Sequence, residues 1–370
     1  MANAIEIKQK NRNNIFRYIY QEKKISKLEI ARGLGLSMPT ITQNLAELFE
    51  RNLIYVNGTF ESTGGRKAKA ICCNMNAKYA IGIDITKNHI SGVLVNLAGE
   101  LIYSLRLRMR FEPTEAYYQK LSSLVDHVAE SGKVSPEMIL GVGISIPAII
   151  DKDNRTIHYA PIVDVRTIYE DLRNRLSYPY AIFNDSKAGG YAELWHAKHV
   201  ENMVYLSLSN SVGGAVLMNN EIYYGEQRFS GEVGHMTLEI DGRPCYCGKK
   251  GCVDAYCNAQ NLSNHTDGDL KRFFELLEAG DEECAAEWQQ YIHYLSVVIN
   301  NLNNMLNCDV ILGGYVGGFM EKHIGELRRL VVERSTFETD GSFIKTCFFK
   351  YESSAVGAAL YFIDEFINAI

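Results

Sequence analysis

One histidine and three cysteines are gathered in a short glycine-containing stretch, GEVGHMTLEIDGRPCYCGKKGCVDAY, residues 231–256. His235, Cys245, Cys247 and Cys252 follow the spacing H-x9-C-x-C-x4-C, and the glycines among them let the backbone curl back. Four nitrogen and sulfur ligands in a closed set are what tetrahedral Zn²⁺ requires at a structural site. The sequence therefore predicts a loop that folds around one structural zinc ion.

Two other interpretations of these cysteines stay open. A redox-active pair would more naturally be C-x-x-C beside a strand-to-helix turn, and the CYC run lacks that spacing. The four residues could also lie in a loop that holds no ion. The chain has nine cysteines, an odd number, and its polar start, MANAIEIKQKNRNN, is unlike a signal peptide. Reduced thiols or a metal are therefore expected rather than a disulfide framework.

The length and composition of the chain indicate a soluble protein of more than one domain. A chain of 370 residues is expected to form two or three domains, and 46% hydrophobic with 22% charged residues is ordinary globular usage. No apolar run approaches the roughly 18 residues that a membrane span requires. We expect a cytoplasmic protein with no membrane partner.

Positive charge is concentrated at the N-terminal end. Residues 1–70 contain 12 Lys and Arg against 6 Asp and Glu, although the whole chain carries a net charge of −6. A basic solvated face would explain this charge as well as a DNA-binding face does. The helical patterns favour DNA: Ser26 and Glu29 form a capping box, Gly33-Leu34-Gly35 ends that helix, and Ser37 caps the next. Two short helices joined by such a turn are typical of a helix-turn-helix.

The third N-terminal helix and the segment after it supply the expected DNA contacts. Ile41, Leu45 and Leu48 share one helix face and must pack inward, so Thr40 and Gln43 face outward. The following run, LIYVNGTFESTGGRKAKAICCN, has two β-prone parts around a basic tip and predicts a wing. The alternative is a small helical packing module with a basic hairpin. The residues expected to contact double-stranded DNA are Ser37, Thr40, Gln43, Asn44, Arg66 and Lys67.

From residue 79 onward, strand patterns alternate with helical patterns, which predicts an α/β architecture. A scheme of strand, hairpin and helix occurs in both halves, so we expect two similar lobes with a ligand cleft between them. The expected division is a winged helix-turn-helix over 1–75, a first lobe over 76–195, and a second lobe with the zinc loop over 196–351, with the C-terminal helix 352–370 packing back on the first lobe.

The motifs quoted above resemble those of the ROK family, named after repressors, open reading frames and kinases. GEVGHM followed by CYCGKKGCVDAY is similar to the zinc-and-sugar signature of that family, and the Gly-Gly-Arg tip is similar to the wing of its repressors, which usually continue with proline where this chain has Lys67. The resemblance covers nearly the whole chain. It implies an actin/hexokinase-like, ribonuclease-H-like fold of two lobes behind the DNA-binding domain.

The resemblance also implies a sugar site. By motif match, Glu232 and His235 would contact sugar hydroxyls, and Asn184 and Asp185 match an Asn-Asp pair whose aspartate is the catalytic base in the kinases. Asp254 stands where the family most often has glutamate, and its carboxylate would also reach the sugar. Read from the sequence alone, Asn184-Asp185 could instead be a helix N-cap.

The phosphate-binding loops of the family's kinases do not match this chain. The kinases carry Asp-x-Gly-Gly-Thr in the first loop, where this chain has DITKN at Asp84–Asn88; their second loop, Gly-Thr-Gly-x-Gly-Gly, is SNSVGG at Ser209–Gly214. Glycine is needed where phosphates approach the backbone closely, so no catalytic activity is expected and Asp185 would be vestigial. We expect a sugar-responsive repressor that binds operator DNA as a homodimer or tetramer. A sugar kinase and a regulator controlled by a sugar-transport protein are the alternatives.

Overall fold

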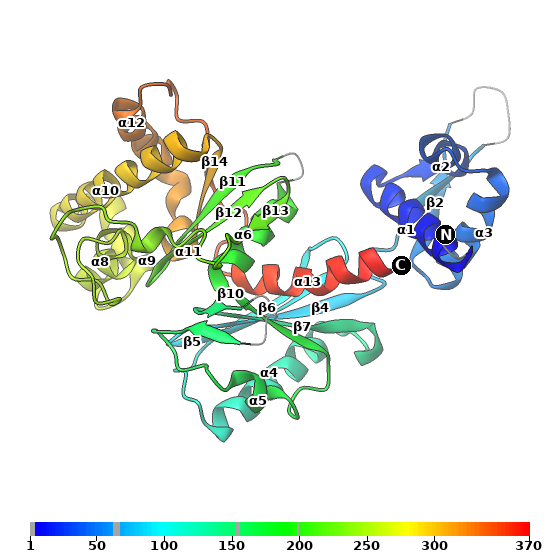
Figure 1. The fold of residues 1–370 in the computed structure, drawn as a ribbon, viewed down its shortest axis with the longest axis horizontal. Helices are drawn as coiled ribbons and strands as arrows, with labels where there is room; N and C mark the ends of the chain where they lie inside the picture. Colours follow the sequence, from blue (N-terminus) through cyan, green and yellow to red (C-terminus); the bar gives the residue numbers. More distant parts are fainter. Residues whose placement is uncertain (1–3, 62–66, 152–155, 198–199) are drawn as a thin grey trace.

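The computed structural model describes residues 4–61, 67–151, 156–197 and 200–370, which form an N-terminal unit and two lobes (Figure 1). The N-terminal unit lies at the right of Figure 1, and the two larger sheets lie below and at the upper left. A helix, α13 (Ser353–Ala369), runs from between the lobes toward the N-terminal unit. Within these ranges, no helix has both the length and the apolar character needed to cross a membrane.

The N-terminal unit consists of three helices and a small antiparallel sheet. Its elements are α1 (Ala4–Glu22), β1 (Ile25–Ser26), α2 (Lys27–Leu34), α3 (Met38–Glu50), β2 (Ile54–Thr59) and β3 (Lys69–Cys73), with strand order β1-β3-β2. Ser26 and Glu29 make both hydrogen bonds of the predicted capping box at the start of α2. This helix stops at Gly35, whose φ of 62° is a left-handed conformation that glycine adopts readily. Ser37 Oγ accepts a hydrogen bond from the Thr40 amide and caps α3.

The predicted apolar stripe of α3 is buried. Ile41, Leu45 and Leu48 pack with Ile15 and Ile19 of α1, and each of these five side chains is at most 4% exposed. The same cluster of buried residues continues into the first lobe and into α13. The N-terminal unit is therefore packed on the body of the protein.

Lobe 1 is built on a five-stranded sheet. Its elements are β4 (Tyr79–Ile85), β5 (His89–Asn96), β6 (Leu101–Arg108), α4 (Glu115–Ser131), β7 (Ile139–Ile146), β8 (Ile149–Ile150), β9 (Ile157–Tyr159), α5 (Ile168–Leu172) and β10 (Tyr180–Asn184). The strand order is β10-β7-β4-β5-β6, with β4, β5 and β6 antiparallel and β7 parallel to both β4 and β10. Ile81 and Ile83 pack toward α4, whereas Gly82 between them faces α13. A Cβ on Gly82 would lie 1.9 Å from the Ala355 carbonyl oxygen, so glycine is required for α13 to lie on the sheet.

Lobe 2 repeats this plan. Its elements are β11 (Met203–Leu208), β12 (Val212–Met218), β13 (Glu221–Tyr223), α7 (Asp254–Cys257), α8 (Gln260–Ser263), α9 (Leu270–Glu278), α10 (Glu282–Leu306), β14 (Asp309–Gly313), α11 (Gly314–Gly317), α12 (Ile324–Arg334) and β15 (Ile344–Thr346). The strand order β13-β12-β11-β14-β15 again joins an antiparallel meander to two parallel strands. Helices α9 and α10 are separated by a short break, because Gly280 has a φ of 85° and Asp281 caps α10.

Helix α6 (Asp185–His196) leads from β10 of lobe 1 into lobe 2. It packs against α13 on one side and against β11 and β12 on the other. The approach to α13 is close: a Cβ on Gly357 would lie 1.7 Å from the Ala188 carbonyl oxygen. The first turn of α6 therefore lies where the two lobes meet, and the polar residues discussed below surround it.

Candidate functional site

The structure brings His235, Cys245, Cys247 and Cys252 together. One possible ligand atom from each residue lies within 4.8 Å of the others, and two isolated β-bridges hold the loop closed. His235 Nδ1 is a buried nitrogen without a hydrogen-bond partner in the described part of the chain. A buried polar atom of this kind needs a partner, and a metal ion supplies one. The three sulfurs and one nitrogen fit a tetrahedral Zn²⁺ site.

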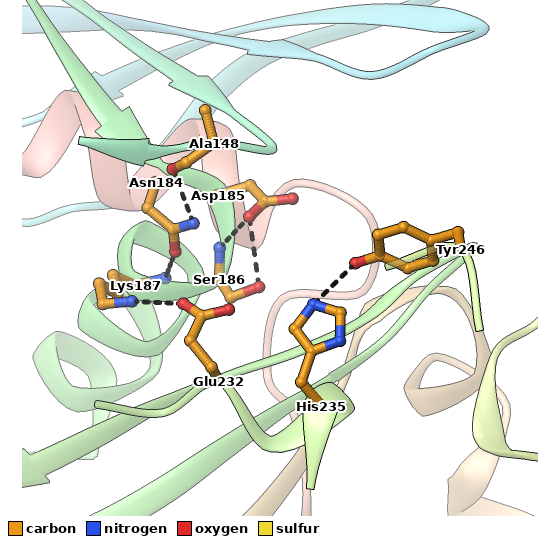
Figure 2. Close-up of polar contacts among 8 residues, drawn as sticks. All are labelled: Ala148, Asn184, Asp185, Ser186, Lys187, Glu232, His235 and Tyr246. Atoms are coloured by element: carbon orange, nitrogen blue, oxygen red, sulfur yellow. Dashed lines mark hydrogen bonds and ion pairs between the residues drawn. The ribbon is translucent and has the colours of Figure 1, made fainter. Parts of the chain in front are cut away.

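The surroundings of the four residues also suit a cation. Burial raises the pKa of the Cys245 and Cys252 thiols, so a neighbouring positive charge is needed to keep them as thiolates. The second ring nitrogen of His235, Nε2, lies 3.2 Å from the Tyr246 hydroxyl, a contact that orients the ring (Figure 2). The metal loop and the polar site beside it are therefore joined through His235.

Asn184 lies at the corner where β10 ends and α6 begins. Its Oδ1 accepts a hydrogen bond of 2.9 Å from the Lys187 amide, and its Nδ2 donates one of 3.1 Å to the Ala148 carbonyl (Figure 2). Asn184 is thus the N-cap of α6, which was the alternative interpretation of this residue. Its amide holds the corner in place, and it also borders the cavity described below.

Lys187 is a site residue that was not predicted from the sequence. Its side chain is 6% exposed, and its Nζ lies 3.2 Å from Glu232 Oε1, on a carboxylate expected to bind sugar (Figure 2). Lys187 occupies the first turn of α6, where the positive end of the helix dipole disfavours a cation. A lysine in the first turn of a helix was therefore the signal in the sequence that could have identified this residue, because a cation there needs a nearby carboxylate.

Two further carboxyl groups near this corner, those of Asp185 and Asp84, have raised pKa values. Burial, with a contribution from Asp84, raises the pKa of Asp185 to about 7. Asp185 Oδ1 accepts hydrogen bonds from the amide and the hydroxyl of Ser186. Burial also raises the pKa of Asp84 to about 6, although the Ser145 hydroxyl donates to it at 2.7 Å. These groups therefore titrate close to neutral pH.

Two adjoining cavities occupy the region between the lobes. The inner one, of about 50 Å³, is bordered by Asn184, Asp185, Glu232 and His235. The outer one, of about 270 Å³, is bordered by side chains of the Asp84–Asn88 and Ser209–Ser211 loops. The residues that line both cavities are Pro147, Pro161, Ile162, Asp185, Ser211 and Tyr246. The two cavities therefore adjoin along these six residues, and together they are called the cleft.

Asp254 departs from the expectation. It is only 3% exposed, and its Oδ1 accepts a hydrogen bond of 2.6 Å from the Val212 amide at the start of β12. In the described ranges it borders neither of the two cavities. The reason is its place as the first residue of α7, from which its side chain turns inward to the sheet. Asp254 therefore supports β12 in this structure, and its contact with the ligand beside Glu232 and His235 stays a prediction from the sequence.

The N-terminal half of α3 presents polar side chains. Ser37 and Gln43 are exposed and Thr40 is partly exposed, as is required of residues that contact DNA. Asn44 is an exception, since it is 1% exposed and donates a hydrogen bond of 2.8 Å to the Thr40 carbonyl. It lies three residues after Ile41 and shares the buried face of the helix, so its assignment as a DNA contact is corrected.

The predicted wing is partly described. Strands β2 and β3 pair in an antiparallel hairpin, as the two β-prone runs predicted. Lys67 is exposed just before β3. Arg66 lies outside the described residues, so its role as a DNA contact stays a prediction from the sequence.

Comparison with known proteins gives concordant results along the chain. The family model described as the ROK family matches residues 80–365. The xylose repressor of Bacillus subtilis (strain 168) is 26% identical over 383 residues, an alignment that covers 100% of this chain and 99% of the repressor. The DNA-binding transcriptional dual regulator NagC of Escherichia coli (strain K12) is 24% identical over 258 residues, 69% of this chain and 64% of the regulator.

Solved structures show the same fold. The crystal structure of a ROK family transcriptional regulator, a homolog of the E. coli MLC protein, has a TM-score of 0.76 at 18% identity and covers 98% of this chain and 97% of its own. A ROK family glucokinase from Streptomyces griseus, solved with glucose and AMPPNP, has a TM-score of 0.66 at 20% identity and covers 76% of this chain and 98% of its own. The α/β fold expected from the sequence, with two lobes of the kinase type behind an N-terminal unit, is confirmed.

Proposed function

The chain belongs to the ROK family, and we propose that it is a sugar-responsive transcriptional regulator, a repressor of carbohydrate-utilisation genes. The observation that carries this proposal is that one chain combines a helix-turn-helix with an exposed polar face and a two-lobed body with a polar cleft. The similarity to a xylose repressor over its full length supports both halves of the proposal. A regulator of this kind works in the cytoplasm, where its operator lies.

Operator DNA is contacted by the N-terminal half of α3 and by the wing. Ser37, Thr40 and Gln43 offer hydroxyl and amide groups suited to base edges and phosphates in the major groove. Arg66 and Lys67 at the wing supply positive charge for phosphates or the minor groove. Two such units, held by a homodimer or by a tetramer, would read an operator with two-fold symmetry.

The sugar is held at the inner end of the cleft. Glu232 and His235 provide a carboxylate and an imidazole for vicinal hydroxyls, and Asp185 provides a further acceptor. Asn184 sets the position of this corner by capping α6. Zinc on His235, Cys245, Cys247 and Cys252 would fix the loop that carries two of the sugar contacts, which is a structural role.

The cleft favours sensing over phosphoryl transfer. At positions where the family's kinases have glycines, this chain instead has Thr86, Lys87, Ser209 and Ser211, and all four line the outer cavity. Side chains there occupy space that phosphates need beside the backbone. The chain is therefore proposed to bind sugar without catalysing a reaction, with Asp185 as a vestigial base.

A thermal-shift screen tests this function. The zinc-loaded protein is heated with single sugars and phosphosugars, each with and without Mg-ATP. A ligand at 100 times its dissociation constant adds about 2.7 kcal/mol to stability, which such a screen detects. We expect at least one sugar to stabilise the protein and Mg-ATP to add nothing. ATP-dependent stabilisation would favour a sugar kinase, and failure of every sugar would favour control by a sugar-transport protein.

A further inference from the structure

We propose that the effector is larger than one sugar ring: an uncharged disaccharide or glycoside whose first ring lies at the inner end of the cleft and whose second unit fills the outer cavity. This inference rests on the proposed sugar response and names the class of ligand. It begins from the sizes of the two adjoining cavities. The inner cavity of about 50 Å³ is far smaller than the roughly 300–1,000 Å³ typical of small-molecule sites, so a ring bound there extends into the adjoining outer cavity.

The outer cavity is the larger part of the cleft. Its volume of about 270 Å³, with the inner cavity added, reaches the lower end of the roughly 300–1,000 Å³ typical of small-molecule sites. Asp185, Ser211 and Tyr246 line both cavities, so the two cavities meet at these side chains, and the proposed ligand crosses there. An occupant of both would be about the size of two sugar rings.

The wall of the outer cavity suits hydroxyl groups. It carries many side chains that both donate and accept hydrogen bonds, namely Thr86, Asn88, Ser207, Ser209, Asn210, Ser211, Gln260, Ser353 and Ser354. Such groups match the alternating donors and acceptors of a polyol. Tyr315 and Tyr351 add two aromatic rings, and the Arg106 guanidinium of β6 lies 4.6 Å and 5.5 Å from their centroids.

The charges in the cleft argue against a polyphosphate in the same space. Asp84 and Asp185 both border the outer cavity, and the ionised form of either carboxyl group would repel a negative ligand nearby. Lys87 and Lys350 also border it, so the wall carries both signs of charge. A wall with charges of both signs suits an uncharged ligand, because such a ligand needs no excess of positive or negative side chains to bind.

A ligand of this length would contact both lobes. Thr86 and Asn88 belong to lobe 1, whereas Ser209 and Asn210 belong to lobe 2. A ligand that bridges the lobes binds one arrangement of them better than another, and that difference is what a regulator requires. A single ring at the inner end would touch fewer groups on the outer walls.

Isothermal titration of the full-length, zinc-loaded protein tests the inference with two matched pairs of probes: xylose against xylobiose, and glucose against cellobiose. We expect one disaccharide to bind at least about tenfold more tightly than its own monosaccharide. The Asn210→Trp variant, which fills the outer cavity from an exposed position, should lose that advantage while the monosaccharide affinity stays within about twofold. Gln119→Trp, on the exposed face of α4, is the matched control and should change neither affinity.

The possible results separate this inference from the function on which it rests. If the monosaccharides bind as tightly as the disaccharides, or if Asn210→Trp leaves the disaccharide advantage intact, the extended effector is wrong and the sugar response stands. Competition of Mg-ATP with the disaccharide for binding would also overturn it, because the outer cavity would then be a nucleotide site. If none of the four sugars binds, both the inference and the sugar response are contradicted.

Discussion

The ammonium of Lys187 and the carboxylate of Glu232 form a pair that connects α6 with the metal loop. Both charges are largely removed from solvent, at 6% and 27% side-chain exposure, so each depends on the other for solvation. A pair of this kind adds little net stability compared with apolar residues, but removal of one partner leaves a charge stranded. At this position the pair holds the Glu232 carboxylate at a fixed place beside the cleft.

Replacement of Lys187 by Met should therefore destabilise the protein by about 2 kcal/mol, measured by urea unfolding. The double variant with Glu232→Gln should be less destabilised than Lys187→Met alone, because no stranded charge remains. Lys345→Met, which breaks the more exposed pair with Asp309, is the control and should cost less than about 1 kcal/mol. Equal costs for the two lysines would show that the Lys187 pair is an ordinary surface contact.

Asp185 makes stability depend on pH in a defined direction. Its pKa is about 7 in the folded chain against 3.8 for an ordinary aspartate, so the folded state binds more protons between these values. Stability contributed by this group is therefore largest at low pH and falls as the pH rises toward and past 7. Asp185→Asn removes the titration while it keeps an acceptor for Ser186.

We accordingly expect the stability of Asp185→Asn relative to the wild type to rise by about 2–3 kcal/mol from pH 5 to pH 8, in urea unfolding at both pH values. The difference between the two proteins separates Asp185, together with its interaction with Asp84, from Glu193, which also has a raised pKa. A gap that stays constant from pH 5 to pH 8 would place the Asp185 pKa outside this window.

At the scale of the element, backbone hydrogen bonds hold the metal loop, among them those from the Leu238 amide to the Gly251 carbonyl and from the Cys245 amide to the Lys249 carbonyl. It contains short bridges and turns, with glycines at φ of 84° and 74° at Gly248 and Gly251. A bound metal would add a cross-link between His235 and the three cysteines, and its binding free energy would contribute directly to the stability of the loop. His235 belongs both to the proposed metal site and to the inner cavity. Loss of the metal should therefore also weaken sugar binding.

Replacing Cys247 with Ser should lower the zinc content from near one ion per chain to well below it after dialysis against a weak chelator, measured by atomic emission. Sugar-dependent thermal stabilisation should be lost in parallel, because His235 is no longer held. Cys308→Ser, a half-buried cysteine outside the loop, should retain both. Zinc content unchanged by Cys247→Ser would mean that the ligand set is wrong.

Helix α3 and the wing make different contributions to DNA binding. Gln43→Ala should weaken binding to the operator more than to unrelated DNA, because an amide side chain can read base edges. Lys67→Ala should weaken binding to the operator and to unrelated DNA about equally. It should also reduce the magnitude of the slope of log affinity against log salt concentration by about one, because one phosphate contact is lost. Fluorescence anisotropy over a range of salt concentrations measures both effects. A Lys67→Ala slope equal to that of the wild type would remove this lysine from the interface.

Local signals in the sequence predicted those elements whose stability is local. The capping box at Ser26 and the cap at Ser37 need only neighbours three residues away, and they were found as expected. The burial of Asn44 and Asp254 was not predicted, because it depends on which faces pack together in three dimensions. Lys187 was missed for the same reason, since its partner Glu232 is 45 residues away.

At the scale of the whole molecule, α13 connects the cleft to the DNA-binding unit. Its first residues, Ser353 and Ser354, border the outer cavity. At its other end, Asn13 of α1 donates a hydrogen bond to the Ile367 carbonyl, and Arg12 donates to the Ile370 carbonyl. Figure 1 shows this helix spanning the distance between the two sites. A ligand that shifts the lobes would therefore move a rigid element that contacts α1, which is a physical route for coupling.

The central claim is that sugar binding changes DNA affinity, and one measurement tests it most directly: the affinity of the full-length protein for operator DNA that it selects from genomic fragments, at moderate salt, with and without the best-binding saccharide. We expect specific binding whose affinity changes by about tenfold on addition of the saccharide, a coupling of about 1.4 kcal/mol. Absence of a specific complex, or a specific complex indifferent to every saccharide that binds the protein, would contradict the account.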